Sequence, residues 1–199
     1  MKIAIVASFL TALLVTGTAC GGGGSDNAAG DKTIPGGKTF RGGGLSFTYP
    51  TEWRVRAAGE PMADADYQVT VGPPGRPHDQ ITATIAELGI VIDGKDVAIT
   101  EENIEEHKQV LVGGAEAAVA FGGGEISEPP TRVSLGGLPG YRYEISHVTD
   151  PLGGKVDSHV TDVFKGTRRY TVVCAYTSEG ATEVKRACDD QVLSSFRVS

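Results

Sequence analysis

Apolar and polar residues alternate along most of the chain after residue 44. In residues 45–50, Leu, Phe and Tyr alternate with small hydroxyl residues, and residues 67–71 and 81–88 repeat the pattern. A period of two is typical of half-buried β-strands, because successive side chains point to opposite faces of a sheet. Residues 52–56 resume the alternation with Trp53 on the apolar side, and we interpret Trp53 as a core anchor.

Two β-hairpins are predicted toward the C-terminus. Residues 133–135 and 141–145 flank a turn rich in glycine and proline at 136–140, which indicates the first hairpin. Residues 156–164 and 168–177 are two further alternating segments and indicate the second.

The register of the second hairpin depends on the length of its loop. Each of its strands has one apolar face, and the two faces coincide only when the loop has an odd number of residues, because a slip of one residue moves every side chain to the other face. We therefore predict a three-residue loop at 165–167. The apolar faces comprise Val156, Val160 and Phe164 on one strand and Tyr170, Val172, Cys174 and Tyr176 on the other.

Two helices are predicted as well. Thr100 followed by two glutamates has the features of a helix start, and Gly113-Gly114 is expected to end that helix. The stretch 115–130 is ambiguous and expected to be mostly loop, since it contains a glycine triplet and Pro129-Pro130. A clearer helix follows Ser178, its expected N-cap. Its apolar stripe consists of residues three or four apart: Ala181, Val184, Cys188 and Val192.

The first twenty residues have the layout of a bacterial export signal. Lys2 precedes an apolar run from residue 3 to 15, and small residues lead to Cys20. The run is shorter than the ~20 residues that a membrane span needs. Residues 17–20, Gly-Thr-Ala-Cys, resemble the Leu-(Ala/Ser)-(Gly/Ala)-Cys motif of bacterial lipoproteins, with glycine in place of leucine. We therefore expect Cys20 to carry a lipid.

The glycine at position 17 leaves one alternative open. Gly17 and Ala19 form a small-x-small site that an ordinary signal peptidase could cut, which would release a secreted protein with an unmodified Cys20. The glycine-rich run after Cys20 favours the lipid-anchored interpretation, because an anchored domain needs a flexible tether. We divide the chain into a lipoprotein signal peptide (1–19), a flexible tether (20–38) and one domain (39–199).

Export also bears on the other cysteines. If Cys20 is acylated, Cys174 and Cys188 remain, and an even remainder outside the cytosol indicates a disulfide. Cys188 lies on the helix stripe that must face the sheet, and Cys174 lies on the apolar face of a neighbouring strand. We expect the two thiols to be bonded.

The charge balance excludes one class of partner. The chain has 18 Lys and Arg against 25 Asp and Glu, a formal charge of −7. Nucleic-acid binding depends on clustered basic residues, so we expect no nucleic-acid partner. The only basic cluster is Arg168-Arg169, extended by Arg132 and Arg142 if these come close, and we interpret it as a solvated rim.

No motif in the sequence predicts catalysis, a cofactor or a metal site. None of the four histidines lies at zinc-ligand spacing, and neither a Gly-x-Ser-x-Gly elbow nor a phosphate-binding glycine loop occurs. Asp189-Asp190 lies on a helix flank and is interpreted as a solvated face. If the protein is an extracytoplasmic hydrolase, the first group to inspect is His147, His159 and Asp157.

Short motifs at both ends of the domain resemble PsbP-like domains. Residues 45–53, Leu-Ser-Phe-Thr-Tyr-Pro-Thr-Glu-Trp, are similar to the opening Phe-x-(Tyr)-Pro-x-x-Trp of that family. The strand 170–176, the helix after it and residues 191–196 resemble its close. Actinobacterial lipoproteins of the Lpq type share the plan of signal, lipid-bearing cysteine, glycine-rich spacer and one such domain. The resemblance implies an α+β fold, an antiparallel sheet flanked by helices in an α/β/α sandwich.

The resemblance also implies accessory or binding roles and supplies no catalytic residues. Our leading hypothesis is a non-enzymatic binding module, anchored on the extracytoplasmic side of the cell membrane through Cys20, with an envelope protein or lipid as its partner. Besides the hydrolase, a carrier with an apolar pocket lined by Trp53, Tyr141 and Tyr143 is an alternative. These aromatic residues more simply fill the core. The oligomeric state is left open.

Overall fold

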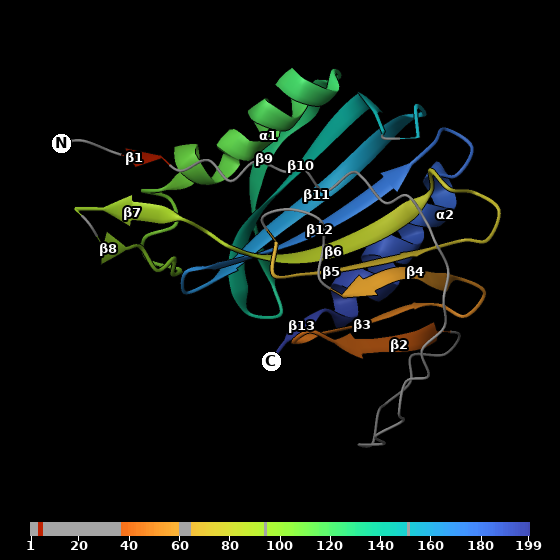
Figure 1. Cartoon of the computed structure of the whole chain (residues 1–199), viewed down its shortest axis with the longest axis horizontal. Coiled ribbons are helices and arrows are strands. Elements are labelled where there is room, and N and C mark those ends of the chain that lie inside the picture. Colours follow the sequence, from red (N-terminus) through yellow and green to blue (C-terminus); the bar gives the residue numbers. More distant parts are fainter. Residues whose placement is uncertain (1–3, 6–36, 60–64, 94, 151) are drawn as a thin grey trace.

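A seven-stranded antiparallel sheet forms the centre of the molecule (Figure 1). The computed structural model describes residues 4–5, 37–59, 65–93, 95–150 and 152–199. The sheet order is β4-β5-β6-β12-β11-β10-β9, so β4 and β9 are its edges. The strands are β4 (Arg54–Gly59), β5 (Tyr67–Gly72), β6 (Gln80–Glu87), β9 (Glu125–Leu135), β10 (Leu138–Thr149), β11 (Lys155–Lys165) and β12 (Arg168–Tyr176).

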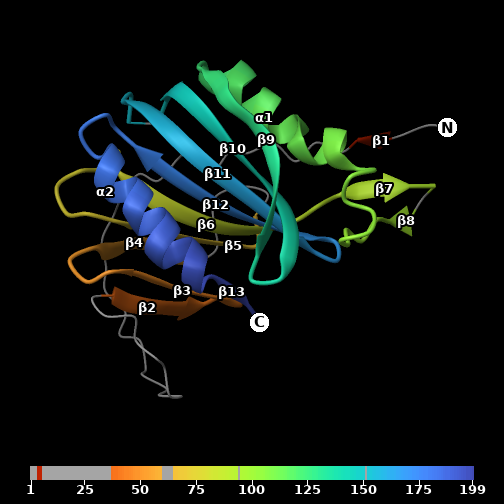
Figure 2. The same cartoon turned by 180° about the vertical axis from the view of Figure 1, so that it is seen from behind.

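Helices lie on opposite faces of this sheet (Figures 1 and 2). Helix α1 (Lys108–Gly122) crosses one face; α2 (Ala181–Arg186) runs directly into the π-helix η1 (Ala187–Leu193) on the other. Below the sheet, three strands form a smaller sheet: β2 (Gly37–Gly42), β3 (Leu45–Pro50) and β13 (Arg197–Val198). A third sheet joins β1 (Ala4–Ile5), β7 (Ile90–Ile92) and β8 (Lys95–Asp96). The α+β fold class expected from the sequence is confirmed.

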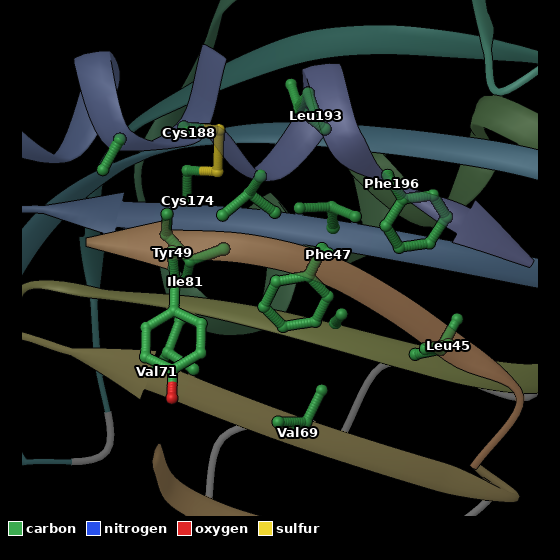
Figure 3. Packing of buried hydrophobic residues seen from close by; sticks show 14 of the residues in the cluster. Leu45, Phe47, Tyr49, Val69, Val71, Ile81, Cys174, Cys188, Leu193 and Phe196 are labelled. Atoms are coloured by element: carbon green, nitrogen blue, oxygen red, sulfur yellow. A yellow bond between two sulfur atoms is a disulfide. The ribbon is translucent and has the colours of Figure 1, made fainter. Parts of the chain in front are cut away.

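The main core lies between the large sheet, β3 and the α2–η1 helix (Figure 3). Phe47 of β3, Val69 and Val71 of β5 and Ile81 of β6 are all buried. The alternation of residues 45–50, 67–71 and 81–88 explains this packing, because each strand turns its apolar set toward the helix. Trp53 is fully buried in the same cluster, as expected of a core anchor.

The opposite face of the sheet packs against α1 in two smaller clusters. Tyr141 and Phe164 lie in one cluster with Leu111 of α1. Tyr143 and Val160 lie in the other with Ala115 of α1. The sheet therefore has a face covered by α1, the α1 face, and a face crossed by α2 and η1, which we call the groove face.

The predicted register of the second hairpin is wrong. The loop has two residues, Gly166 and Thr167, and Lys165 pairs with Arg168. Gly166 has a φ of 63°, a conformation that a tight hairpin turn requires and that glycine adopts at little cost. Cys174 consequently lies opposite His159, so polar residues of β11 share the groove face with the apolar residues of β12.

The predicted limits of the first helix are also wrong. Residues 101–107 form turns, and α1 begins at Lys108 and continues through Gly113 to Gly122. Glycine weakens a helix by about 1 kcal/mol relative to alanine, but Leu111 and Ala115 are buried against the sheet and hold this one together. Pro129-Pro130, expected in a loop, lies within β9, where proline is tolerated because β9 is an edge strand.

Strand β2 starts at Gly37. The last two residues of the segment expected to be a flexible tether (20–38) therefore belong to this strand. Cys20 lies outside the described residues. At the C-terminal end, Val198 pairs with Leu45 and Phe196 is buried, so the tail packs on β3.

Candidate ligand-binding groove

A groove of about 760 Å³ lies on the groove face, between the helix and the strands next to the β9 edge. One wall is the end of β9 and the β9–β10 turn, the floor comes from β10 and β11, and the other wall is η1 with the residues after it. The lining combines apolar, hydroxyl and charged side chains: Val133, Ser134, Leu135, Gly136, Arg142, Thr161, Asp189, Leu193, Ser194 and Arg197.

An ion pair crosses the groove. Arg142 of β10 donates from Nη2 to Asp189 Oδ1 of η1 at 2.8 Å. The same Nη2 lies 3.0 Å from Nδ1 of His159 on β11. Arginine can only donate, so this His159 nitrogen accepts and the proton of the neutral ring lies on Nε2. Arg142 therefore connects the sheet floor to the helical wall.

Beneath this pair lies a second polar group centred on Glu144. His159 Nε2 donates to Glu144 Oε2 at 3.0 Å, and the Tyr176 hydroxyl donates to Glu144 Oε1 at 2.6 Å. Lys185 Nζ of α2 lies 3.4 Å from the same oxygen. Burial would raise the pKa of Glu144, but the hydrogen bond from Tyr176, the neighbouring imidazole of His159 and the charge of Lys185 outweigh it and hold that pKa below its ordinary value. Glu144 is thus an ionised acceptor at neutral pH.

Tyr176 is affected in the opposite direction. Burial, followed by its hydrogen bond to Glu144, raises the pKa of the Tyr176 phenol far above its ordinary value. The ring also packs edge-on against His159 and lies under the ammonium group of Lys185. Tyr176 therefore stays protonated and keeps donating to Glu144.

The π-helix forms the helical wall of the groove. It presents Asp189 and Leu193, four residues apart, to the groove, while Cys188 and Val192 point into the core. π-helical segments are rare and occur frequently at functional sites. Cys188 Sγ is bonded to Cys174 Sγ of β12, so a disulfide anchors the wall one residue before Asp189 (Figure 3).

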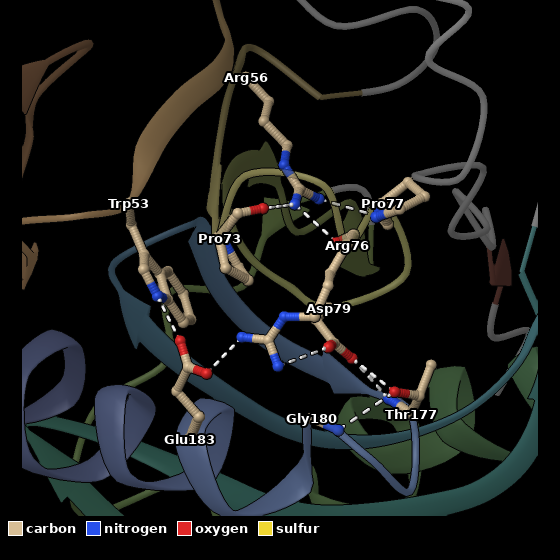
Figure 4. A network of polar contacts seen from close by, with 9 residues as sticks. All are labelled: Trp53, Arg56, Pro73, Arg76, Pro77, Asp79, Thr177, Gly180 and Glu183. Atoms are coloured by element: carbon tan, nitrogen blue, oxygen red, sulfur yellow. Dashed lines mark hydrogen bonds and ion pairs between the residues drawn. The ribbon is translucent and has the colours of Figure 1, made fainter.

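The start of α2 is fixed by a network at the opposite end of the helix (Figure 4). Glu183 accepts from Trp53 Nε1 at 2.9 Å and pairs with Arg76. The hydrogen bond from Trp53 and the charge of Arg76 overcome the effect of burial and lower the pKa of Glu183. Asp79, which is buried, accepts from the backbone N–H and hydroxyl of Thr177 at 2.8 and 3.0 Å.

Thr177, rather than the expected Ser178, supplies the side chain at the helix start. Its hydroxyl accepts from the backbone N–H of Gly180, the N-cap residue. A Cβ at Gly180 would collide with the Asp79 carboxylate, so glycine is required by this close approach. Arg56 clamps the adjacent loop by donating to the carbonyls of Pro73, Arg76 and Pro77 (Figure 4). The helical wall is therefore held at its start by this network and in its middle by the disulfide.

The residues singled out for hydrolase chemistry are not brought together as a catalytic group. Asp157 Oδ1 accepts from the backbone N–H of His147, at an irregularity in β10. His159 pairs with Glu144 instead, and its second nitrogen is occupied by Arg142. Neither ring nitrogen of His159 is free to accept a proton from a substrate in this arrangement.

The aromatic residues considered for a carrier pocket do not share one cavity. Trp53 belongs to the main core, Tyr141 and Tyr143 to the two clusters under α1 on the other face. The hydroxyl of Tyr141 donates to the carbonyl of Ile104, and that of Tyr143 to Asp162. All of them fill the core.

Three of the four arginines considered as one basic cluster form separate ion pairs. Arg168 pairs with Glu87, Arg132 with Glu101 and Arg142 with Asp189. Sequence reasoning treated Asp189 as a solvated flank and Arg142 as a rim residue, and so missed the groove. One signal in the sequence pointed to a position near the sheet for Asp189: it directly follows Cys188, which was expected to face the sheet.

These features define a PsbP-like α+β fold, as the short sequence motifs indicated. The solution structure of cyanobacterial PsbP (CyanoP) from Synechocystis sp. PCC 6803 superposes with a TM-score of 0.54, at 16% identity, over 87% of this chain and 98% of that one. LpqN of Mycobacterium tuberculosis, whose crystal structure is described as that of a protein involved in cell envelope biogenesis, superposes with a TM-score of 0.52, at 13% identity, over 85% and 87%. At these identities the likeness concerns the fold.

The sequence itself has no comparable match. No family model matches the chain, and no curated protein does. Within the described ranges, no helix has the length and apolar character that a membrane span requires. In the same part of the chain, no three His, Cys, Asp or Glu side chains are grouped so that they could hold a metal ion.

Proposed function

We propose that the chain is a non-enzymatic binding module of the cell envelope, moored to the outer face of the cell membrane by a lipid on Cys20, and that the groove is its binding surface. The observation that carries this proposal is the groove itself. The Arg142–Asp189 ion pair ties its floor to its helical wall, and the Cys174–Cys188 disulfide fixes that wall on the sheet. A site built on a pre-formed scaffold loses little entropy when a ligand binds.

Two further points support the proposal. The volume of about 760 Å³ lies within the 300–1,000 Å³ that small-molecule sites typically occupy. The fold is similar to that of LpqN, described as involved in cell envelope biogenesis, and the export signal and Cys20 would deliver this chain to the same kind of location.

A binding role is favoured over hydrolysis because His159, the histidine of β11 beside the groove, is already paired. Both ring nitrogens of His159 have partners within the protein. A general base needs a free nitrogen within hydrogen-bond reach of the substrate. The group supports the floor of the groove and presents no reactive atom to it.

Site-specific photo-crosslinking in the native membrane tests the groove as the binding surface. A photo-reactive residue replaces Ser134 or Ser194, which face the groove from opposite walls, and in a matched control it replaces Ser178, exposed at the start of α2 outside the groove. We expect the same adduct at positions 134 and 194 and its absence at 178. If positions 134 and 194 yield only the cross-linked adducts that position 178 also yields, the proposal is wrong.

A further inference from the structure

The charge of the groove differs from that of the rest of the protein. The whole chain has a formal charge of −7, yet the charged groove residues are two arginines and one aspartate. Asp189 is neutralised by Arg142 at 2.8 Å, so Arg197 supplies an excess positive charge. In an acidic protein, such a local reversal concentrates anions at the groove.

Arg197 has donors left for a ligand. Its Nη1 donates to the carbonyls of Phe196 and Ser194 at 2.7 and 3.4 Å, which holds the guanidinium next to the groove. Among the described residues, no carboxylate pairs with Arg197, and its Nε and Nη2 donate to none of them. A guanidinium with free donors in a fork matches the oxygens of a phosphate or carboxylate.

Arg142 can contribute from the sheet floor. Only its Nη2 is used by His159 and Asp189, which leaves Nε and Nη1 without acceptors in the described part of the chain. The two guanidinium groups come from different sides of one groove, Arg142 from its floor and Arg197 from the wall that includes η1. A tetrahedral phosphate offers oxygens in several directions and suits donors that approach from two sides better than a planar carboxylate does.

Thr161 on β11 offers a further polar group from the floor of the groove. The residue is only 4% exposed, and its hydroxyl makes no hydrogen bond to any residue that the structure describes. Its oxygen is not one of the fully buried, unpaired side-chain atoms, so it faces the water in the groove. A ligand oxygen in the groove can take the place of that water.

The remaining lining suits hydroxyl groups next to the phosphate. Asp189 can only accept, while the hydroxyls of Ser134 and Ser194 can accept as well. Ligand hydroxyls both donate and accept, so they can bind beside Asp189 without adding a charge. Val133, Leu135 and Leu193 provide apolar contact for a short carbon skeleton.

We propose that the groove recognises a phosphate ester carried on a small polyol, with Arg197 and Arg142 binding the phosphate and Asp189 and Thr161 binding hydroxyl or ester oxygens. This inference rests on the proposed function, because it names the ligand class of the same groove. The chemistry is shared by free phosphorylated polyols and by the head group of a polyol phospholipid.

Titration calorimetry of the mature protein at low salt tests the ligand class. The soluble probes are sn-glycerol 3-phosphate, inorganic phosphate and glycerol; the membrane probes are vesicles of phosphatidylglycerol and of phosphatidylcholine. We expect glycerol 3-phosphate to bind more tightly than inorganic phosphate or glycerol, and its affinity to fall as salt is raised. Preference for phosphatidylglycerol vesicles identifies a lipid head group as the source, and binding of the soluble ester alone identifies a free metabolite.

Matched variants locate the site. Arg197→Gln should weaken binding of glycerol 3-phosphate about tenfold or more, the usual effect of losing a charge-assisted hydrogen bond. Arg54→Gln makes the same charge change on an exposed arginine of β4, the opposite edge strand, and should leave the affinity unchanged. Equal weakening by both variants would show non-specific attraction and overturn the proposal.

Thr161→Val separates a ligand-binding role from a structural one. Valine keeps the shape and removes the hydroxyl, so binding should weaken several-fold while the thermal unfolding midpoint stays the same or rises. If Thr161→Val leaves the affinity unchanged, or if neither phosphate-ester probe binds better than its neutral counterpart, this inference is wrong. Should photo-crosslinking at Ser134 still capture a ligand in that case, the groove remains the binding surface and only the ligand class assigned to it fails.

Discussion

The indole N–H of Trp53 donates to the carboxylate of Glu183 at 2.9 Å, although 130 positions separate the two residues in the sequence. Trp53 is fully buried between β3 and the helix, and Glu183 lies in the first turn of α2. Glu183 also pairs with Arg76 from the loop between β5 and β6. One carboxylate therefore connects three distant parts of the chain and sets where the helical wall of the groove begins.

Loss of this carboxylate should destabilise the fold. Glu183→Ala leaves the buried Trp53 N–H without an acceptor and frees Arg76, and we expect the free energy of unfolding in urea to fall by about 1–3 kcal/mol. Glu179→Ala, at an exposed position one turn earlier, should change it by less than about 0.5 kcal/mol. Equal effects of the two variants would contradict the role assigned to Glu183.

The disulfide should contribute to stability and to the shape of the groove. Cys174 and Cys188 are 14 positions apart, and closing a loop of this length stabilises a protein by about 3 kcal/mol in the loop-entropy model. Reduction should lower the urea midpoint accordingly, and the Cys174→Ala/Cys188→Ala variant should not respond to reductant. An unchanged midpoint after complete reduction would contradict this prediction.

All six tyrosines should resist ionisation until the protein unfolds in alkali. Burial raises the pKa of Tyr49, Tyr67, Tyr141, Tyr143, Tyr170 and Tyr176 above the ordinary value of 10.0. In the unfolded chain these phenols lose their protons near pH ~10, but in the folded protein they lose them only at higher pH. The stabilisation is therefore complete below pH ~10 and declines as the pH rises further.

Spectrophotometric titration checks this expectation. Tyrosinate absorbance and the loss of circular dichroism should rise together in one cooperative step above pH ~10. Tyr143, whose pKa burial and then the neighbouring Asp162 raise strongly, should ionise only in that step, and Tyr143→Phe should remove one tyrosinate from the final amplitude. Gradual ionisation near pH ~10 in a folded protein would show that the phenols are accessible.

The lipid on Cys20 stays a prediction from the sequence. The intact mass of the mature protein, extracted from its native membrane, should show acyl chains on an N-terminal Cys20 and a deficit of two hydrogens from the disulfide. Cys20→Ser should move the protein from the membrane fraction to the medium. A mature wild-type protein with an unmodified cysteine would show instead that an ordinary signal peptidase releases it.

The strands were predictable because alternation is a local property. Residues 45–50 form β3 as expected, 67–71 falls one residue short of the end of β5, and 81–88 is shifted by one residue from β6. The hairpin register failed because it was inferred from maximal apolar matching. The actual two-residue turn at Gly166-Thr167 places His159 and Thr161 on the groove face, beside apolar residues of β12.

The first helix and the groove were not predictable for a different reason. Local propensity stops a helix at Gly113, but burial of Ala115 against the sheet continues it, and that contact is tertiary. The groove joins β9, β10, β11 and η1, and no local pattern states that Arg142 and Asp189, 47 positions apart, form an ion pair. Long-range polar pairs of this kind leave no periodic signal.

Pro129 and Pro130 affect how other polypeptides can meet the outer edge of the sheet. They lie on β9, an edge strand, and neither has an N–H to offer an incoming strand. Backbone pairing that would extend the sheet past β9 is therefore disfavoured at these two positions. The same feature works against edge-to-edge polymerisation of neighbouring copies of the chain through this strand.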